Sequence, residues 1–390
     1  MSTDFLTRSL ELTPELVRLR RYFHQHPETG TSLPQTEAYV HRQLTDMGYQ
    51  PQHIPNAGLL ISAGQGHGRT LLIRGEMDAL PMEETSGETF SSRCPGAAHT
   101  CGHDLHTTFL LGAAKLLKEQ EAQLPGTVKL FFQTGEETLE GAENAIRSGV
   151  LLHPNVDAAL GVHVQPLLPV GCLNIPKGAF LSSTDMFRIH IHGKGCHGAM
   201  PHLGVDPIQI AAHIILALHT LQVKEVPADE PVVLNICKME AGSASNIVPN
   251  EACLLGTLRT YNDSICQTLK ERIQDISHGV AQSFRGQAQV EFMEHCPTTV
   301  NDPAFVDFID RSLQTFGRTF VSDPDYRLQV SDDFAFYSQT VPSAMIMLGC
   351  QPDGGERIPN HSPNVRYNET VLPIGAALLA HLAADWQARR

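Results

Sequence analysis

Three histidines, one cysteine and one aspartate fall within eight residues of this chain, in the segment HTCGHDLH at residues 99–106. Thiolate and imidazole ligands suit zinc, cobalt, nickel or manganese better than calcium. Gly102 would let the backbone turn, so that Cys101 and His103 on either side of it converge. The outer two histidines need not be ligands, because helix capping or support of the ligands would equally explain them. The segment therefore predicts a transition-metal site.

Two further segments place pairs of carboxylates directly after apolar strands. RGEMDALP carries Glu76 and Asp78, and FQTGEE ends in Glu136 and Glu137. Open α/β sheets place their sites at the carboxyl ends of parallel strands. Adjacent carboxylates repel each other, unless one binds a cation and the other serves as a general base. The alternative interpretations are a solvated loop for the first segment and an acidic helix N-terminus for the second.

Two single histidines complete the set. His163 ends the apolar run of GVHV, where a core histidine is the usual explanation, and His361 lies in the loop segment NHSP. Together with Cys101, His103 and Glu137, they stand at the ends of elements that should share one sheet edge. A two-metal hydrolase needs such a ligand set with a spare carboxylate beside it. Two cations that share a water lower its pKa and polarise a carbonyl oxygen.

Strands and helices alternate in the segments that must position these residues. Short apolar runs predict buried strands, at residues 58–62, 70–74, 128–132 and 157–161. Helical patterns predict helices, at residues 13–23, 33–47, 107–119 and 141–148. This order predicts an α/β fold with a mixed, mostly parallel sheet that helices cover on both faces.

The pattern changes near Ser183. Residues 186–192 alternate apolar and polar side chains, as a half-exposed antiparallel strand does. A strand–helix–strand–strand–helix–strand order follows, which describes a ferredoxin-like α+β domain. After His295 the α/β pattern returns, with helices predicted at residues 304–316 and 372–387. We therefore predict one domain inserted into another, with boundaries at residues 1–183, 184–295 and 296–390.

The composition of the chain argues against some classes of binding partner. The 390 residues carry a net charge of −14, which argues against a nucleic-acid or anionic-membrane partner. No uninterrupted apolar stretch reaches the roughly 18–20 residues of a membrane span, and the N-terminus lacks the pattern of a secretory signal. Nine scattered cysteines without a CxxC predict no disulfide scaffold. We therefore expect a cytoplasmic protein.

In their order along the chain, RGEMDALP, HTCGHDLH, FQTGEE, GVHV and NHSP resemble the motifs of metal-dependent amidohydrolases. That family includes aminoacylases, hippurate hydrolases and plant auxin-conjugate hydrolases, and it is related to the glutamate carboxypeptidases. The resemblance runs from about Arg20 to the C-terminus. It implies a catalytic α/β domain with an inserted lid or dimerisation domain, a homodimer, and two divalent ions per subunit (Zn, Mn, Co or Ni).

The resemblance also implies roles for single residues. The implied metal ligands are Cys101, His103, Glu137, His163 and His361. Glu136 matches the general base, and Asp78 matches the acid that supports the metal site from behind. Glu76 departs from the close family, which more often has Asp there, and we assign it no ligand role. A cysteine replaces the bridging aspartate of the carboxypeptidases at position 101, which leaves the identity of the metal open.

In the inserted domain, the segment GKGCHGAMPH matches the part of the family that presents a histidine to the active site, often that of the partner subunit. His197 is the candidate, and His202 is a lesser one. Asn246 in SNIVP and Arg259 in GTLR match residues that contact substrate carboxylates in related carboxypeptidases. Arg259 could instead pair with an acid across its sheet.

The expected activity is hydrolysis of small N-acyl amino acids, with acetyl, benzoyl or longer acyl groups, to a carboxylate and a free amino acid. A dipeptidase, an N-acetyl-diaminopimelate deacetylase or a p-aminobenzoyl-glutamate hydrolase could use the same site. A non-catalytic metal-binding protein with this fold is the remaining alternative. The complete ligand set beside Glu136 argues against it.

Overall fold

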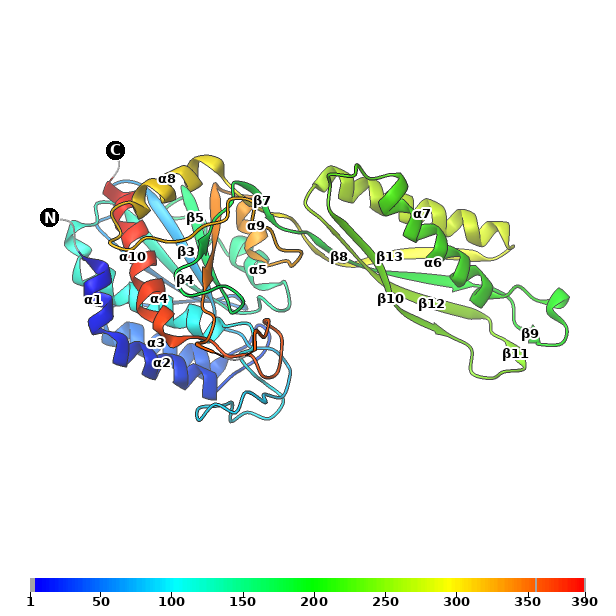
Figure 1. Ribbon diagram of the computed structural model, residues 1–390, viewed down its shortest axis with the longest axis horizontal. Coiled ribbons are helices and arrows are strands. Elements are labelled where there is room, and N and C mark those ends of the chain that lie inside the picture. The colour runs from blue at the N-terminus through cyan, green and yellow to red at the C-terminus, as the bar shows by residue number, and fades with distance from the viewer. Residues whose placement is uncertain (1–3, 355, 389–390) are drawn as a thin grey trace. The chain divides into compact units, whose positions relative to one another are not determined.

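The computed structural model describes residues 4–354 and 356–388, and the chain divides into two compact units (Figure 1). Unit 1 comprises the described residues of Met1–Gly178, Val300–Tyr326 and Asp332–Arg390. Unit 2 comprises Ala179–Thr299 and a short return segment, Arg327–Ser331. The return segment lies outside the insertion predicted at residues 184–295. The chain passes between the units near β7 (Gly178–Leu181) and β14 (Thr299–Asn301).

Unit 1 is built on a seven-stranded sheet in the order β1-β2-β4-β3-β5-β15-β6. Its strands are β1 (Gln52–Ile54), β2 (Gly58–Ala63), β3 (Thr70–Glu76), β4 (Thr127–Gln133), β5 (Ala158–Gln165), β6 (Leu173–Asn174) and β15 (Ser343–Gly349). The four strands β4, β3, β5 and β15 are parallel, and antiparallel β2 and β6 flank them. All residues of β3, β4 and β15 are buried, which explains their nearly continuous apolar sequences.

Helices cover both faces of this sheet. They are α1 (Phe5–Glu11), α2 (Thr13–Gln25), α3 (Pro34–Asp46), α4 (His103–Glu119), α5 (Gly141–Arg147), α8 (Pro303–Leu313), α9 (Phe334–Ser338) and α10 (Leu372–Ala388), with 3-10 turns at Glu121–Gln123 and Glu369–Val371. Helices α4 and α10 pack on one face, and α5 and α9 pack on the other (Figure 1). The predicted helix-covered α/β sheet is confirmed.

Helix α4 begins at His103, four residues before the start predicted from its apolar pattern. Gly102 precedes it with a φ of +89°, in the left-handed region that favours glycine. A Cβ atom at this position would lie 2.4 Å from Cγ2 of Val164, so a larger residue would not fit. The predicted backbone turn is confirmed, and it places Cys101 and His103 on either side of a sharp bend.

The C-terminal helix α10 lies in the core of unit 1. Together with the preceding 3-10 turn it forms the stretch Glu369–Ala388, which among the described residues is the one helical stretch long and apolar enough to cross a membrane, and it is mostly buried inside the structure. Such an apolar helix is typical of a protein core, because neighbours surround it on every side. Near its end, the Trp386 ring packs edge-on against Phe305 and Phe308, with ring centroids 5.0 and 5.1 Å away.

Unit 2 contains a four-stranded antiparallel sheet in the order β10-β12-β8-β13. Its elements are β8 (Thr184–His192), α6 (Pro207–Lys224), β10 (Val232–Ala241), β12 (Glu251–Thr260), α7 (Asp263–Ser283) and β13 (Gln287–Cys296). Both helices pack on one face of the sheet, and alternate residues of β12 are buried against them. The predicted ferredoxin-like order is confirmed. A small ribbon, β9 (Cys196–His197) with β11 (Ile247–Val248), and the 3-10 turn Pro201–Leu203 complete the unit.

Candidate metal centre

All five predicted metal ligands come together in unit 1. Sγ of Cys101 lies 3.3 Å from Nε2 of His361 and 3.5 Å from Nε2 of His163. Oε1 of Glu137 lies 3.5 Å from Nε2 of His361 and 4.0 Å from Nε2 of His103. These residues come from the start of α4, the loop after β4, the end of β5 and the loop before α10. The fold therefore gathers one sulfur, one carboxylate and three imidazoles around a common centre.

Backbone carbonyls orient two of the three imidazoles. Nδ1 of His103 lies 2.8 Å from the carbonyl oxygen of Asp78, and Nδ1 of His163 lies 2.8 Å from that of Val164. A carbonyl oxygen can only accept, so each Nδ1 carries a proton and donates it. In the neutral ring this leaves the Nε2 lone pair free, and both Nε2 atoms face the cluster. Histidines that bind metals are usually held in this way.

Two of the donor atoms are buried without a partner. Nε2 of His103 and Oε1 of Glu137 form no hydrogen bond with any described residue. Leaving such an atom unsatisfied costs about 1–3 kcal/mol, more for a charged group. The backbone of His361 adopts a φ of +63°, which is costly for a residue with a Cβ atom. A cation shared by these donors would satisfy the buried atoms, so the residues present fit a metal centre.

Burial and neighbouring charges shift the pKa values of three of these side chains. Burial, with Glu137 and Glu136 nearby, raises the pKa of the Cys101 thiol well above its usual range. Burial and the charge of His106 lower the pKa of His163, which keeps its imidazole neutral. Burial opposes the protonation of His103, but its acidic neighbours, Asp78 first, raise its pKa to about 10. A bound cation would reverse this balance, because it stabilises the thiolate and displaces the imidazole proton.

Glu136 stands beside the ligand cluster. Its Oε2 lies 3.8 Å from Nε2 of His103, and the residue is buried. Burial raises the pKa of Glu136 well above its usual range, and the nearby Asp332 and Glu137 raise it further. A carboxylate with a raised pKa accepts protons more readily near neutral pH. These are the properties of a general base.

Asp78 supports the cluster from behind. Its Oδ2 accepts a hydrogen bond from the N–H of Glu137 at 3.0 Å, while its backbone carbonyl accepts from Nδ1 of His103. One buried residue thus fixes the start of α4 and the loop after β4, each of which carries a predicted ligand.

Glu76 and His106 lie near the centre but already have partners. Nδ1 of His106 lies 3.1 Å from Oε2 of Glu76, and its Nε2 accepts a hydrogen bond from the N–H of Val164 at 2.9 Å. Glu76 also forms an ion pair with Arg74. With these contacts both side chains are satisfied, so they are better placed to support the ligands than to bind a cation.

A buried acidic pair, Asp332 and Asp333, was not among the predicted site residues. One carboxylate oxygen of each lies within 4.8 Å of an oxygen of Glu136. Arg74 forms ion pairs with both aspartates, at 3.0 Å to Oδ1 of Asp332. The only signal in the sequence is two adjacent acids before an apolar segment, in SDDF.

A second buried ionic network holds the start of α4 from the opposite side. Oδ2 of Asp104 accepts a hydrogen bond from Nε of Arg20 at 2.8 Å, and Nδ1 of His24 lies 2.8 Å from the same atom. Nε2 of His24 lies 3.1 Å from Oε1 of Glu84, whose Oε2 accepts from the N–H of Ser92 at 2.6 Å. The network ties α2 and the loop of residues 84–92 to the helix that begins with His103.

The remaining predicted residues lie in unit 2. His197 in β9 pairs with Ile247 in β11, and the N–H of Gly198 donates to the carbonyl oxygen of Asn246 at 2.8 Å. His197 lines a cavity of about 710 Å³, and His202 lies in the neighbouring 3-10 turn. The structure thus brings His197 and Asn246 close together.

Arg259 lies at the other end of the unit 2 sheet. It stands near the end of β12, whereas β9 and β11 adjoin the start of that strand at Glu251. At about 3.3 Å per residue along β12, Glu251 and Arg259 are about 26 Å apart. The Arg259 guanidinium donates to Oγ1 of Thr184 at 2.6 Å, and burial lowers its pKa. No described acid pairs with it.

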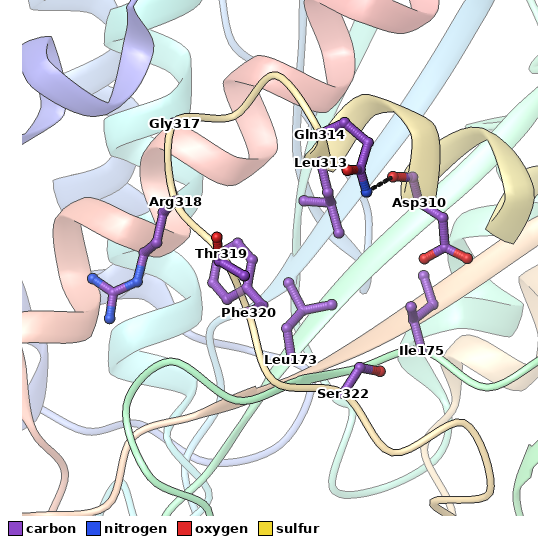
Figure 2. Close-up of a pocket in the computed structure, with 10 residues that line it drawn as sticks. All are labelled: Leu173, Ile175, Asp310, Leu313, Gln314, Gly317, Arg318, Thr319, Phe320 and Ser322. Carbon is purple, nitrogen blue, oxygen red and sulfur yellow. Dashed lines mark hydrogen bonds between the residues drawn. The ribbon is translucent and has the colours of Figure 1, made fainter.

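Unit 1 also has a hollow of about 320 Å³ away from these residues (Figure 2). Leu173, Ile175, Leu313 and Phe320 give it apolar walls, and the Gln314 amide donates to the carbonyl oxygen of Asp310 at 3.3 Å. None of the predicted site residues lines it, so it has no part in the proposed chemistry.

Comparison with known proteins agrees with this site. Residues 72–385 match the model of peptidase family M20/M25/M40. The chain is 36% identical to IAA-amino acid hydrolase ILR1-like 5 of Arabidopsis thaliana, over 95% of this chain and 86% of that protein. It is 32% identical to N-acetyl-L-cysteine deacetylase of Bacillus subtilis (strain 168), over 95% and 89% respectively.

A solved structure shares the whole fold. The YXEP protein of Bacillus subtilis, described as a dinuclear metal binding peptidase from the M20 family, superposes with a TM-score of 0.83 at 29% identity. The match covers 96% of this chain and 98% of that one. The resemblance found in the five motifs is confirmed, and the chain is a hydrolase. It belongs to the peptidase family M20/M25/M40.

Proposed function

We propose that this enzyme cleaves the amide bond of N-acyl amino acids to give a carboxylate and a free amino acid. The observation that carries the proposal is the meeting of Cys101, His103, Glu137, His163 and His361 beside the free carboxylate of Glu136. Two relatives are named for related substrates, an IAA-amino acid and N-acetyl-L-cysteine.

Two divalent ions, of zinc, manganese, cobalt or nickel, would be held by these five side chains. The mixture of thiolate, imidazole and carboxylate suits such ions. When bound, the ions would lower the pKa of a water molecule and polarise the amide carbonyl oxygen.

The protein's own groups would carry the proton and hold the substrate. Glu136 takes a proton from the attacking water and passes it to the leaving amine nitrogen, so that the products are a carboxylic acid and an amine. Asp78 holds the Glu137 backbone and the His103 ring in place during this transfer. His197 would stabilise the oxyanion of the tetrahedral intermediate, with His202 as a lesser candidate.

Asn246 and Arg259 would bind the amino-acid carboxylate, where a guanidinium can contact both oxygens. Because the two residues lie at opposite ends of the unit 2 sheet, they could contact one carboxylate only if two copies of the chain supplied them. This supports the predicted homodimer, in which the partner subunit would present His197 and Asn246. Elution at the size of a monomer would contradict it.

The proposal is tested by a substrate panel assayed with the metal-supplemented enzyme. The acyl group and the amino acid are varied separately. The panel contains acetyl, benzoyl and long-chain acyl derivatives of small, acidic and aromatic amino acids. Dipeptides and p-aminobenzoyl-glutamate are assayed beside them as the alternative substrates. We expect kcat/KM to be highest for N-acyl amino acids, and no turnover with chelator present. Faster cleavage of dipeptides, or an activity that the chelator does not affect, would overturn the proposal.

A further inference from the structure

The segment of residues 134–141 comprises the loop between β4 and α5 and the first residue of α5. It carries both Glu136 and Glu137, and we call it the acid loop. Its two ends lie close together. The N–H of Gly141 donates to the carbonyl oxygen of Gly135 at 3.0 Å. A Cβ atom at position 141 would lie only 1.9 Å from the carbonyl oxygen of the first loop residue. Whatever holds these two ends therefore also sets the positions of the two glutamates.

One buried carboxylate contacts the chain on both sides of this loop. Nε2 of Gln133, the residue directly before the loop, donates to Oδ1 and Oδ2 of Asp333 at 2.9 and 2.7 Å. The N–H of Ala142, the residue directly after it, donates to Oδ2 at 2.8 Å. Asp333 is 0% exposed, so water does not compete for these hydrogen bonds.

The orientation of the Gln133 amide is fixed from its other end. Oε1 of Gln133 accepts hydrogen bonds from the hydroxyl of Tyr337 at 2.9 Å and from Nε of Arg74 at 3.2 Å. Arginine can only donate, so the amide oxygen must face it, and the amide nitrogen must face Asp333. Arg74 also forms an ion pair with Asp333 and supplies the opposite charge.

We propose that Asp333 is a positioning residue that clamps both ends of the acid loop. Its described contacts are with Gln133, Ala142 and Arg74 and not with the predicted ligands, and the inference rests on the proposed function of Glu136 and Glu137. A second contact that fixes the acid loop is the hydrogen bond from the N–H of Glu137 to Oδ2 of Asp78. With the clamp released, the base and the ligand lose their fixed positions, and a misplacement of about 1 Å can cost about 10²-fold in rate.

Exchanging the side-chain types of Asp333 and Gln133, an acid and an amide, tests this clamp. Asp333→Asn leaves two amides facing each other, and Gln133→Glu leaves two buried carboxylates that repel. The double variant with both changes restores one donor and one acceptor, and it keeps the net charge around Arg74. We expect each single change to lower kcat at least tenfold with KM altered less than threefold, and the double variant to recover at least fivefold of the loss.

A second readout does not depend on activity. In the metal-free protein, hydrogen exchange of the amides at residues 134–142 should be faster in Asp333→Asn than in the wild type, and the double variant should restore protection. Asp302→Asn is the matched control, because Asp302 accepts from the N–H of Phe305 at 2.7 Å at the start of α8 and has no described contact with the acid loop. Asparagine also caps helices well, so this control should keep its stability, kcat and the exchange rates of the loop.

The outcomes separate the clamp from the proposed function. Wild-type kcat and loop exchange in Asp333→Asn, or a folded double variant no better than the single ones, would overturn the clamp. If the single variants do not fold, Tyr337→Phe is the alternative test, because it removes only one hydrogen bond to Gln133. It should lower kcat several-fold, and an unchanged kcat would count against the clamp. If the wild type hydrolyses no N-acyl amino acid, the proposed function fails, and the exchange measurement alone decides about the clamp.

Discussion

His103 and His163 illustrate how single hydrogen bonds prepare this centre. Each ring donates its Nδ1 proton to a backbone carbonyl, which leaves Nε2 as the only nitrogen available to a cation. Because these bonds form within the folded protein, the rings do not have to reorient when a metal binds. The five predicted ligands were found from the order of their motifs along the chain and from the family resemblance, because no single motif identifies a ligand on its own.

The partners that hold these residues could not be predicted in the same way. Asp333 is 200 residues away from Gln133 along the chain, and Arg20 is 84 residues from Asp104. Nothing in the local sequence of Asp333 shows that a distant amide needs an acceptor. Such contacts depend on the tertiary fold, which pattern and propensity do not determine.

The role of Glu136 is tested by Glu136→Gln. The amide keeps the shape of the side chain but cannot take up the proton, so we expect kcat to fall by about 10²–10⁴-fold. Metal content, measured by elemental analysis, should stay unchanged, because Glu136 is not a predicted ligand. Glu140→Gln, an exposed change in the same loop, is the control. Turnover within tenfold of the wild type would exclude Glu136 as the base.

Glu84 should give the stability of unit 1 a defined pH dependence. Burial opposes its ionisation, but hydrogen bonds with His24 and Ser86 lower the pKa of Glu84 to about 2. An acid with a lowered pKa stabilises the fold above its unfolded value near 4.5, and this contribution is lost as the pH falls toward 2.

We therefore expect Glu84→Gln to lower the free energy of unfolding at pH 6 on the order of 2 kcal/mol. The difference from the wild type should shrink as the pH approaches 3, as measured by urea unfolding at both pH values. The exposed neighbour Glu83 provides the control substitution, Glu83→Gln. A difference that is the same at both pH values would contradict the assignment.

At the scale of elements, three errors of prediction lie near the site. Helix α4 starts at His103 rather than at residue 107, because its first turn is polar and resembles a loop in sequence. Strand β5 extends through His163 to Gln165, beyond the apolar run at residues 157–161. Helix α9, with five residues, is too short to show a period. In α4 polar residues near the site replace the apolar pattern that marks an element, and in β5 His163 interrupts it, whereas α9 is apolar but short.

The turn before α4 provides a matched test at this scale. Gly102 and Gly96 both have positive φ, at +89° and +76°, but only Gly102 has a neighbour, Val164, in the space of a Cβ atom. Gly96→Ala should cost about 1–2 kcal/mol of unfolding free energy from backbone strain alone. Gly102→Ala should cost more and should also lower metal affinity at least tenfold, measured by titration calorimetry. Equal effects on stability and metal binding would show that the close packing is unimportant.

At the scale of the whole molecule, every predicted ligand belongs to unit 1. A metal that binds only the native form of unit 1 stabilises it by about 2.7 kcal/mol when its free concentration is 100 times Kd. We expect calorimetry to show two transitions, of which added metal raises only the one from unit 1. Cys101→Ser should reduce this shift. A shift of both transitions by the same amount would mean that the units unfold together.

The fluorescence of Trp386 distinguishes the unfolding of unit 1 from that of unit 2. It is the only tryptophan in the sequence, and its ring packs edge-on against Phe305 and Phe308 in the core of unit 1. Its emission therefore reports the unfolding of unit 1, which carries the predicted ligands, and gives no signal of its own from unit 2. Tryptophan fluorescence could thus follow the unfolding of unit 1 by heat, urea or acid, in the wild type and in the variants, without any added label.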